Sequence, residues 1–237
     1  MREESVRFES FDLSATGFVR SSAILRRMQQ AAREDLASYG IHYEDLREKN
    51  MAFVVSRIAL VLEKPVLGER PYVLRTAANP THGATFPRSF VMEDENGVVM
   101  RAMSLWALLD FEKRALLRPS ALGEELPVFA DLSGGVICER LFKSKEEPIC
   151  EDSRKVYASM LDQNNHLNNC IYVDLATDLF PEGSGKVCEV QIAFQHEARL
   201  GEILALKGFS LPDGSTLVSG EFSKREESCF LCKIKTF

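Results

Sequence analysis

The sequence predicts an α+β protein in which one arrangement, a helix followed by the strands of an antiparallel sheet, occurs twice. Two observations support this fold class. Apolar residues recur at helical spacing over residues 23–39 and again over residues 171–179. Each of these segments is followed by a series of short β-branched or alternating segments with turn residues between them. Helices and strands that occupy separate stretches of a chain typically form the layers of an α+β fold.

The first helix is expected over residues 23–39, after a strand over residues 6–14. Ser21 or Ser22 suits the N-cap, because a serine hydroxyl can accept a hydrogen bond from a free N–H group of the first turn. Gly40 suits the position just after the helix, where the chain often turns into a left-handed conformation. The apolar stripe of this helix consists of Leu25, Met28, Ala32, Leu36 and Tyr39.

Four strands are expected after this helix, over residues 53–62, 72–77, 86–92 and 98–110. Glu95-Asn96-Gly97 gives a hairpin signal between the last two. The final strand carries apolar residues on both faces, so we expect it at the centre of the sheet.

The second half begins after residues 111–155, which contain repeated Pro and Gly and are expected to form a connector. A strand is expected over residues 156–160, and a second helix over residues 171–179 that ends at residues 181–183. The apolar stripe of this helix consists of Ile171, Leu175 and Leu179, with Tyr172 and Ala176 beside them. Further strands are expected over residues 187–197, 203–210, 216–222 and 229–237.

A polar cluster stands just before the second helix. Asp162, Asn164 and His166 occupy alternate positions, and in a nearly extended chain such positions point the same way. An acid, an amide and an imidazole directed at one spot are the components of a hydrolytic site. Asn168 or Asn169 follows and is expected to cap the helix.

The two halves also resemble one another residue by residue. Ser22-Ala-Ile-Leu25 aligns with Asn169-Cys-Ile-Tyr172, and Ser56-Arg-Ile-Ala-Leu60 aligns with Val190-Gln-Ile-Ala-Phe194. We therefore expect an internal repeat.

This alignment serves as an internal control for the polar cluster, since it places Ala15, Gly17 and Val19 where the second half has the acid, the amide and the imidazole. A cluster that only capped a helix would occur in both copies, but it occurs in one. The repeat favours chemistry in the second half and a structural or substrate-holding role for the first.

Composition places the chain among ordinary globular proteins, with 237 residues, 45% of them hydrophobic and 27% charged. The formal net charge of −6 argues against a general nucleic-acid binder, which needs a basic face. We expect no membrane span, because no window holds roughly 18 consecutive apolar residues. The charged start Met1-Arg-Glu-Glu-Ser-Val6 lacks the apolar core of a signal peptide, so we expect a cytoplasmic protein.

The cysteines are expected to be reduced, because no secretion signal accompanies them. Cys229 and Cys232 have CxxC spacing, but they fall in an expected strand that sends positions three apart to opposite faces. We interpret them as small buried residues and expect neither a metal nor a cofactor.

The chain resembles the acyl-acyl carrier protein (acyl-ACP) thioesterases of plants and bacteria. The resemblance extends over nearly the whole chain. It rests on Phe86-Pro-Arg-Ser-Phe90, on 101–110 with Lys113-Arg114, on the motif of Asp162 to Asn169, and on Phe194-Gln-His-Glu197. It implies two fused hotdog domains, each a long helix wrapped by an antiparallel β-sheet. The implied division is an N-terminal domain over 1–125 that holds the substrate tunnel, a connector over 126–153, and a catalytic C-terminal domain over 154–237.

The resemblance also implies the activity, namely hydrolysis of fatty acyl-ACP to free fatty acid, which terminates fatty acid synthesis. The implied catalytic residues are Asp162, Asn164, His166 and Glu197. The family often has a cysteine after the glutamate, whereas this chain has Ala198, so a carboxylate-and-water mechanism is the simpler expectation. The implied partner is an acyl carrier protein bearing a fatty acyl chain, and a homodimer is an open alternative to a monomer.

Several alternatives stay open at this point. Asp162 either positions His166 or attacks the thioester itself. Strict alternation puts Glu197 on the face of Gln191 and Gln195, so either a bulge redirects it or the site lies on the outer face of its strand. A metal site formed by Asp162, His166 and Glu197 is a weaker alternative, since the ligand spacing is irregular.

Substrate recognition leaves alternatives as well. The chain is expected to act on acyl-ACP, with an acyl-CoA thioesterase or a non-catalytic acyl-binding protein of the same fold as alternatives. Leu25, Met28, Phe53 and Trp106 are candidates for lining the acyl tunnel, although each also suits an ordinary core. Candidate docking groups for an acidic carrier protein are Arg26, Arg27 and Arg33, or Lys143, Lys145, Arg154 and Lys155.

Overall fold

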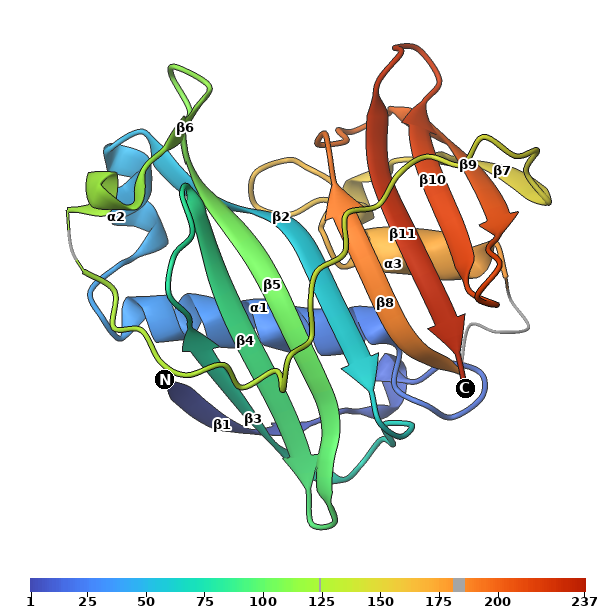
Figure 1. Cartoon of the computed structure of the whole chain (residues 1–237). Helices are drawn as coiled ribbons and strands as arrows, with labels where there is room; N and C mark the ends of the chain where they lie inside the picture. Colours follow the sequence, from blue (N-terminus) through green and yellow to red (C-terminus); the bar gives the residue numbers. More distant parts are fainter. Residues whose placement is uncertain (124, 181–185) are drawn as a thin grey trace. The chain divides into compact units, whose positions relative to one another are not determined.

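In the computed structural model, the first predicted helix is α1 (Ser21–Ala37), shifted two residues toward the N-terminus relative to the prediction (Figure 1). Ser21 and Ser22 are therefore its first residues and do not precede it as caps. Gly40 adopts φ 78°, the left-handed conformation that glycine tolerates best, but the helix ends at Ala37, two residues before the predicted end. The structure describes residues 1–123, 125–180 and 186–237.

The chain forms two units that interleave along the sequence. The first consists of Met1–Arg7, Arg26–Glu63 and Arg70–Cys138, and the second of Phe8–Leu25, Lys64–Glu69 and Glu139–Phe237. Two backbone hydrogen bonds explain why the short N-terminal segments group together: Val19 N–H donates to Val66 O (2.9 Å), and Glu69 N–H donates to Phe8 O (2.9 Å). The domains expected from the sequence were consecutive, whereas these units exchange short segments.

The sheet of the first unit has the strand order β1-β3-β4-β5-β2, with β6 paired to β5. The strands are β1 (Arg2–Arg7), β2 (Met51–Leu62), β3 (Pro71–Ala78), β4 (Thr85–Asp94), β5 (Gly97–Asp110) and β6 (Ala115–Leu117), and α2 (Tyr43–Glu48) precedes β2. All pairs are antiparallel. Strand β5 lies between β4 and β2, as its two apolar faces predict.

The first strand lies at residues 2–7, so the prediction of residues 6–14 is mostly wrong. The chain leaves the sheet because Ser10–Asp12 form a short 3₁₀ turn, in which the Asp12 carboxylate accepts a hydrogen bond from Glu9 N–H (3.1 Å). Local side-chain chemistry of this kind competes with strand formation.

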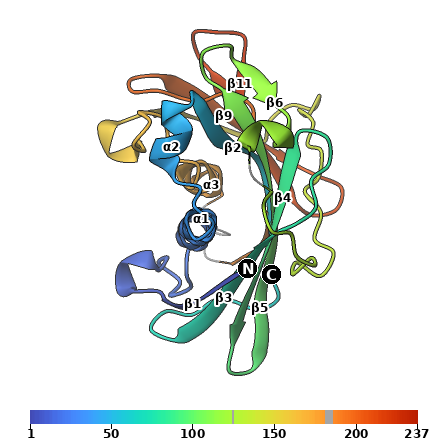
Figure 2. The ribbon, with the colours of Figure 1, turned by 90° about the vertical axis from the view of Figure 1, so that its left-hand side faces the viewer.

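The core of the first unit lies between α1 and its sheet, which curves around the helix in Figure 2. One apolar cluster of this unit consists of Ile41, Leu46, Met51, Phe86, Leu108 and Leu122. Of the candidate tunnel residues, Phe53 and Trp106 pack against this cluster, and Phe53 meets the Phe86 ring edge to face at 5.0 Å. Met28 is buried on α1.

The sheet of the second unit has the strand order β8-β11-β10-β9-β7, which repeats the order β2-β5-β4-β3-β1 of the first. The strands are β7 (Cys150–Lys155), β8 (Val187–Phe194), β9 (Ile203–Ser210), β10 (Thr216–Phe222) and β11 (Ser228–Thr236). This equivalence confirms the predicted repeat. The strand expected at 156–160 is wrong, because β7 ends at Lys155 and Ala158–Met160 form a 3₁₀ turn; β7 also occupies the end of the expected connector.

The second helix is α3 (Ile171–Asp178), which packs on the sheet of its unit through Tyr172. The Tyr172 ring meets Phe194 of β8 at 5.5 Å and Phe230 of β11 at 5.1 Å. The predicted stripe is partly wrong, because the buried residues of α3 are Tyr172, Val173, Leu175 and Ala176, while Ile171 and Leu179 are only half-buried. The predicted helix end at 181–183 lies outside the described residues.

All six cysteines lie within the described ranges and are free thiols. Cys229 and Cys232 are fully buried on β11, as expected for small core residues. Across the described residues, no helix has the length and apolar character needed to cross a membrane.

Candidate active site

Residues 161–167 form a tight turn, which corrects the expectation of a nearly extended chain. Asp162 N–H donates to His166 O (2.8 Å), and Asn165 N–H donates to Asp162 O (3.1 Å). Asn165 takes the left-handed conformation with φ 60°, which asparagine tolerates better than most residues. A chain that turns back in this way cannot send three alternate side chains in one direction.

The Asp162 carboxylate holds this turn together. Its Oδ1 accepts hydrogen bonds from the N–H groups of Asn164 (2.8 Å) and His166 (3.1 Å), the pattern of an Asx turn. Asn164 lies exposed at the tip of the turn. At the other end, Asn168 Oδ1 accepts from Cys170 N–H (3.0 Å). Cys170 is itself the N-cap of α3 and no side-chain hydrogen bond caps the helix there, so the predicted asparagine cap is wrong.

Glu197 lies in a loop beyond the end of β8. The N–H groups of Gln195 and His196 both donate to Cys229 O, at 2.9 and 3.1 Å, so two residues of one strand face one residue of its partner. This is the arrangement of a β-bulge. It breaks the alternation of β8 after Phe194 and removes the conflict over which face carries Glu197.

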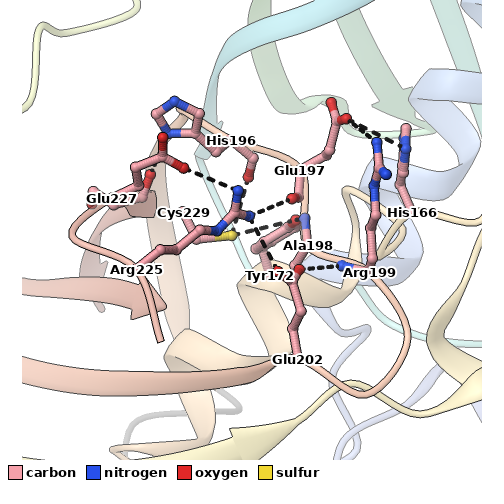
Figure 3. A network of polar contacts seen from close by, with 11 residues as sticks. His166, Tyr172, His196, Glu197, Ala198, Arg199, Glu202, Arg225, Glu227 and Cys229 are labelled. Atoms are coloured by element: carbon pink, nitrogen blue, oxygen red, sulfur yellow. Dashed lines mark hydrogen bonds and ion pairs between the residues drawn. The ribbon is translucent and has the colours of Figure 1, made fainter. Parts of the chain in front are cut away.

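His166 and Glu197 face one another across two adjacent loops (Figure 3). The loops are joined by a hydrogen bond from Leu167 N–H to Ala198 O (2.8 Å) and by a bridge between His166 and Arg199. The His166 Nε2 atom lies 3.6 Å from Glu197 Oε1, and the side chains are 31% and 54% exposed. An imidazole and a carboxylate thus share a site that water can reach.

Two arginines that the sequence motifs did not indicate also contact Glu197. Arg199 Nη2 donates to Glu197 Oε1 (2.8 Å), and Arg225 Nη2 donates to Glu197 O (3.2 Å). Arg199 stands two residues after Glu197, a spacing that puts both side chains on one side of an extended segment and could have indicated the pair. Arg225 belongs to the hairpin between β10 and β11, and its distance along the chain gave no signal.

The Tyr172 hydroxyl forms a hydrogen bond with the loop that carries Glu197. It accepts a hydrogen bond from Ala198 N–H (3.3 Å) and lies 3.6 Å from the Cys229 thiol (Figure 3). Burial raises the pKa of Tyr172 and raises the pKa of Cys229 to about 12, so both groups are neutral at neutral pH. Because thiolate is the nucleophilic form of cysteine, Cys229 is inert in this state.

The loop before α1 duplicates the Asp162 turn and corrects the alignment of the repeat by one residue. Ser14 N–H donates to Phe18 O (2.8 Å) and Gly17 N–H donates to Ser14 O (3.0 Å), the same pattern as in the second copy. Gly17, with φ 82°, stands where the second copy has a left-handed asparagine. The true counterparts of Asp162, Asn164 and His166 are therefore Ser14, Thr16 and Phe18, and not Ala15, Gly17 and Val19.

This corrected alignment distinguishes the residues that the turn itself requires from those that it does not require. Both copies carry short polar residues at the first two positions, which is what the turn itself requires. The copies differ at the third position, where Phe18 replaces the imidazole. Val19 N–H bonds Val66 O as Leu167 N–H bonds Ala198 O, so Pro65 stands where the second copy has its glutamate. The turn does not require His166 or Glu197, and these two residues occur together in one copy.

The described residues contain no group of three or more His, Cys, Asp or Glu side chains arranged to hold a metal ion. Among the candidate docking groups, Lys143 pairs with Glu221 (2.6 Å) and Arg154 pairs with Asp152 (2.6 Å). The connector group is thus partly neutralised. Arg26, Arg27 and Arg33 are exposed on α1, and Arg33 pairs with Glu44 (3.6 Å).

Comparison with known proteins gives a match to one family model, described as the acyl-ACP thioesterase N-terminal domain, over residues 2–125. Among curated protein sequences, no match was found.

Three solved structures resemble nearly the whole chain. An acyl-ACP thioesterase from Bacteroides thetaiotaomicron has a TM-score of 0.89 at 18% identity, covering 98% of this chain and 96% of the other. A putative oleoyl thioesterase from Lactobacillus plantarum has a TM-score of 0.81 at 16% identity, covering 99% and 96%. The 12:0-ACP thioesterase from Umbellularia californica has a TM-score of 0.83 at 16% identity, also covering 99% and 96%. At these identities the similarity shows a shared fold, and it confirms the predicted α+β double hotdog.

Proposed function

Because the chain belongs to the acyl-ACP thioesterase family, we propose that it hydrolyses the thioester of fatty acyl-ACP, releases a free fatty acid and so terminates fatty acid synthesis. The observation that carries this proposal is the pairing of His166 with Glu197 at 3.6 Å in the copy of the repeat whose turn does not need them.

In the proposed reaction, His166 and Glu197 orient a water molecule and remove one of its protons as it attacks the thioester carbonyl carbon. The carbonyl π electrons move to oxygen, and N–H groups at the start of α3 or the Asn164 amide stabilise this oxyanion. The intermediate then collapses and the C–S bond breaks. The departing thiolate takes up the proton that the base had removed and is released as a thiol. A thiolate is a good leaving group, so little acid assistance is needed.

Asp162 is proposed to act on His166 through the backbone. Its Oδ1 already accepts two N–H groups of the turn, one of them from His166 itself. This engagement favours positioning over direct attack, since a nucleophilic carboxylate oxygen would have to leave those hydrogen bonds.

Water is proposed as the nucleophile because the Cys229 thiol, which contacts the loop before Glu197, is not activated. Ala198 occupies the position after the glutamate, and the nearby Cys229 thiol is buried with a pKa raised to about 12.

The test is the release of free thiol from acyl-ACP substrates of varying acyl length, with acyl-CoA thioesters of matched length in parallel. We expect kcat/KM to be higher on acyl-ACP. His166→Gln and Glu197→Gln should each lower kcat on the order of a hundredfold or more, as expected for removal of a general base. Asp162→Asn should lower it less.

Thr16→Ala is the matched control, because Thr16 occupies the position in the first copy that Asn164 occupies in the second. It should leave kcat unchanged. Near-wild-type turnover in both His166→Gln and Glu197→Gln would contradict the assignment of the site. Retention of fatty acid without turnover by the wild-type protein would indicate a non-catalytic acyl-binding protein.

A further inference from the structure

Glu197 lies outside the regular sheet, so the strand pairing of β8 does not hold it in place. The last ladder pair of β8 joins Phe194 to Phe230, and Glu197 follows the bulge by one residue. A base must be held close to its productive geometry, since misplacement by about 1 Å can lower the rate on the order of a hundredfold. A loop residue needs a support that the ladder does not give it.

We infer that Arg225 is a positioning residue that holds the backbone of Glu197 and thereby places its carboxylate beside His166. Arg225 Nη2 donates to the carbonyl oxygen of Glu197 at 3.2 Å (Figure 3). This side chain crosses from the β10–β11 hairpin to the loop, so it joins two segments that are 28 residues apart. The inference rests on the proposed function and specifies how its site is assembled.

The guanidinium of Arg225 is itself fixed from several sides. Its Nη1 contacts Glu227 Oε2 at 3.0 Å, and its Nη2 contacts Glu202 Oε1 at 3.4 Å. Its plane lies over the Phe222 ring, 3.5 Å from the ring centroid. These contacts use the flat, forked shape of the guanidinium, which a lysine ammonium cannot reproduce.

Glu202 links this support to the other end of the loop. Its Oε2 accepts a hydrogen bond from Arg199 N–H (2.7 Å), while its Oε1 faces Arg225. The segment from Glu197 to Glu202 is therefore bound to Arg225 at both ends. Arg199 has a different role, because it contacts the Glu197 carboxylate directly and not the backbone.

The first copy of the repeat supports this division of roles. The hairpin equivalent to β10–β11 joins β4 to β5 through Glu95-Asn96 and contains no basic residue. Its partner loop carries Pro65 where the second copy has Glu197. The arginine on the hairpin and the carboxylate on the loop thus occur in the same copy.

The main test compares Arg225→Ala and Arg225→Lys with Lys224→Ala, a substitution of the adjacent basic residue on the same hairpin. On acyl-ACP, we expect both Arg225 variants to lower kcat on the order of tenfold to a hundredfold with little change in KM, because the base is misplaced while substrate binding is kept. Lys224→Ala should match the wild type. Equal kcat in the wild type and in Arg225→Lys would contradict the inference.

A double-mutant cycle separates positioning from a general loss of structure. In a Glu197→Gln background the base is already absent, so Arg225→Ala should cause almost no further loss of kcat. If Arg225→Ala slows the Glu197→Gln variant by the same factor as it slows the wild type, Arg225 acts elsewhere and the inference is wrong.

Hydrogen exchange provides a readout that does not depend on activity. In Arg225→Ala and Arg225→Lys, amide exchange over residues 195–202 should accelerate, including that of Ala198 N–H, while exchange in β4 and β5 stays unchanged. If the wild type hydrolyses neither thioester, the proposed function fails, and exchange alone decides the inference. Unchanged exchange over residues 195–202 would overturn it.

Discussion

The hydroxyl group of Tyr172 offers a sharp test of how the candidate site is supported. Tyr172→Phe removes one oxygen atom and keeps the ring, so the edge contacts with Phe194 and Phe230 remain. The lost oxygen is the acceptor for Ala198 N–H at 3.3 Å. Ala198 is 0% exposed and Tyr172 is 2% exposed, so water has little access to replace the bond.

The magnitude follows from the N–H group that is left without an acceptor. An unsatisfied buried donor costs about 1–3 kcal/mol, because its desolvation is no longer offset. For a chain of this size each kcal/mol shifts the melting temperature by about 2–4 °C, so the expected decrease is about 2–12 °C. Because Ala198 adjoins Glu197, kcat on acyl-ACP should fall as well, while KM stays nearly constant.

The assay is unfolding by heat and by urea, each followed by circular dichroism, with thiol release measured in parallel. Tyr157→Phe is the matched control, since it makes the same chemical change on a tyrosine that is 56% exposed. It should stay within about 0.5 kcal/mol of the wild type. A Tyr172→Phe variant that is equally unaffected in both stability and kcat would refute the reasoning.

Three further predictions concern stability and can be measured by urea unfolding. Burial raises the pKa of Cys229 from 9.0 to about 12, so the neutral thiol stabilises the fold fully below pH 9 and this stabilisation is lost as pH rises toward 12. The free energy of unfolding should fall by about 1.4 kcal/mol per pH unit in this range, and Cys229→Ala should make that fall less steep. Asp35→Asn should cost about 3–5 kcal/mol, because it leaves Arg88 without its buried partner at 2.7 Å, whereas Asp35→Leu combined with Arg88→Met should recover most of the loss. Gly220→Ala should cost about 1–3 kcal/mol, because its Cβ would overlap the ring of the buried Phe230; a cost below about 0.5 kcal/mol would contradict the packing of that ring.

Strand and helix positions followed from local patterns wherever burial alone decided them. The ranges of β9 and β10 match the prediction to the residue, because alternation and flanking turns define both ends. The predictions failed where the backbone forms short local turns. Ser10–Asp12 and Ala158–Met160 form 3₁₀ turns in place of predicted strands, and apolar alternation carries no information about such turns.

Alignment of the two halves of the sequence detects the repeat but pairs its residues incorrectly. The duplication was visible in the order of elements and in a few matching residues. The alignment was one residue off, because only the hydrogen bonds show that Ser14 and Asp162 begin the same turn. The correction changes the interpretation, since Asp162 and Asn164 have polar counterparts and His166 does not.

The sequence by itself determined the fold class, the order of the elements, the family resemblance and the residue types available for chemistry. These properties depend on local periodicity and on which side chains stand where along the chain. The tertiary structure decided which of those residues meet. His166 and Glu197 face each other because a bulge ends β8 at Phe194 and a backbone bond joins Leu167 to Ala198. Arg225 reaches the same loop from a hairpin 28 residues away, and no sequence periodicity encodes a contact of that kind.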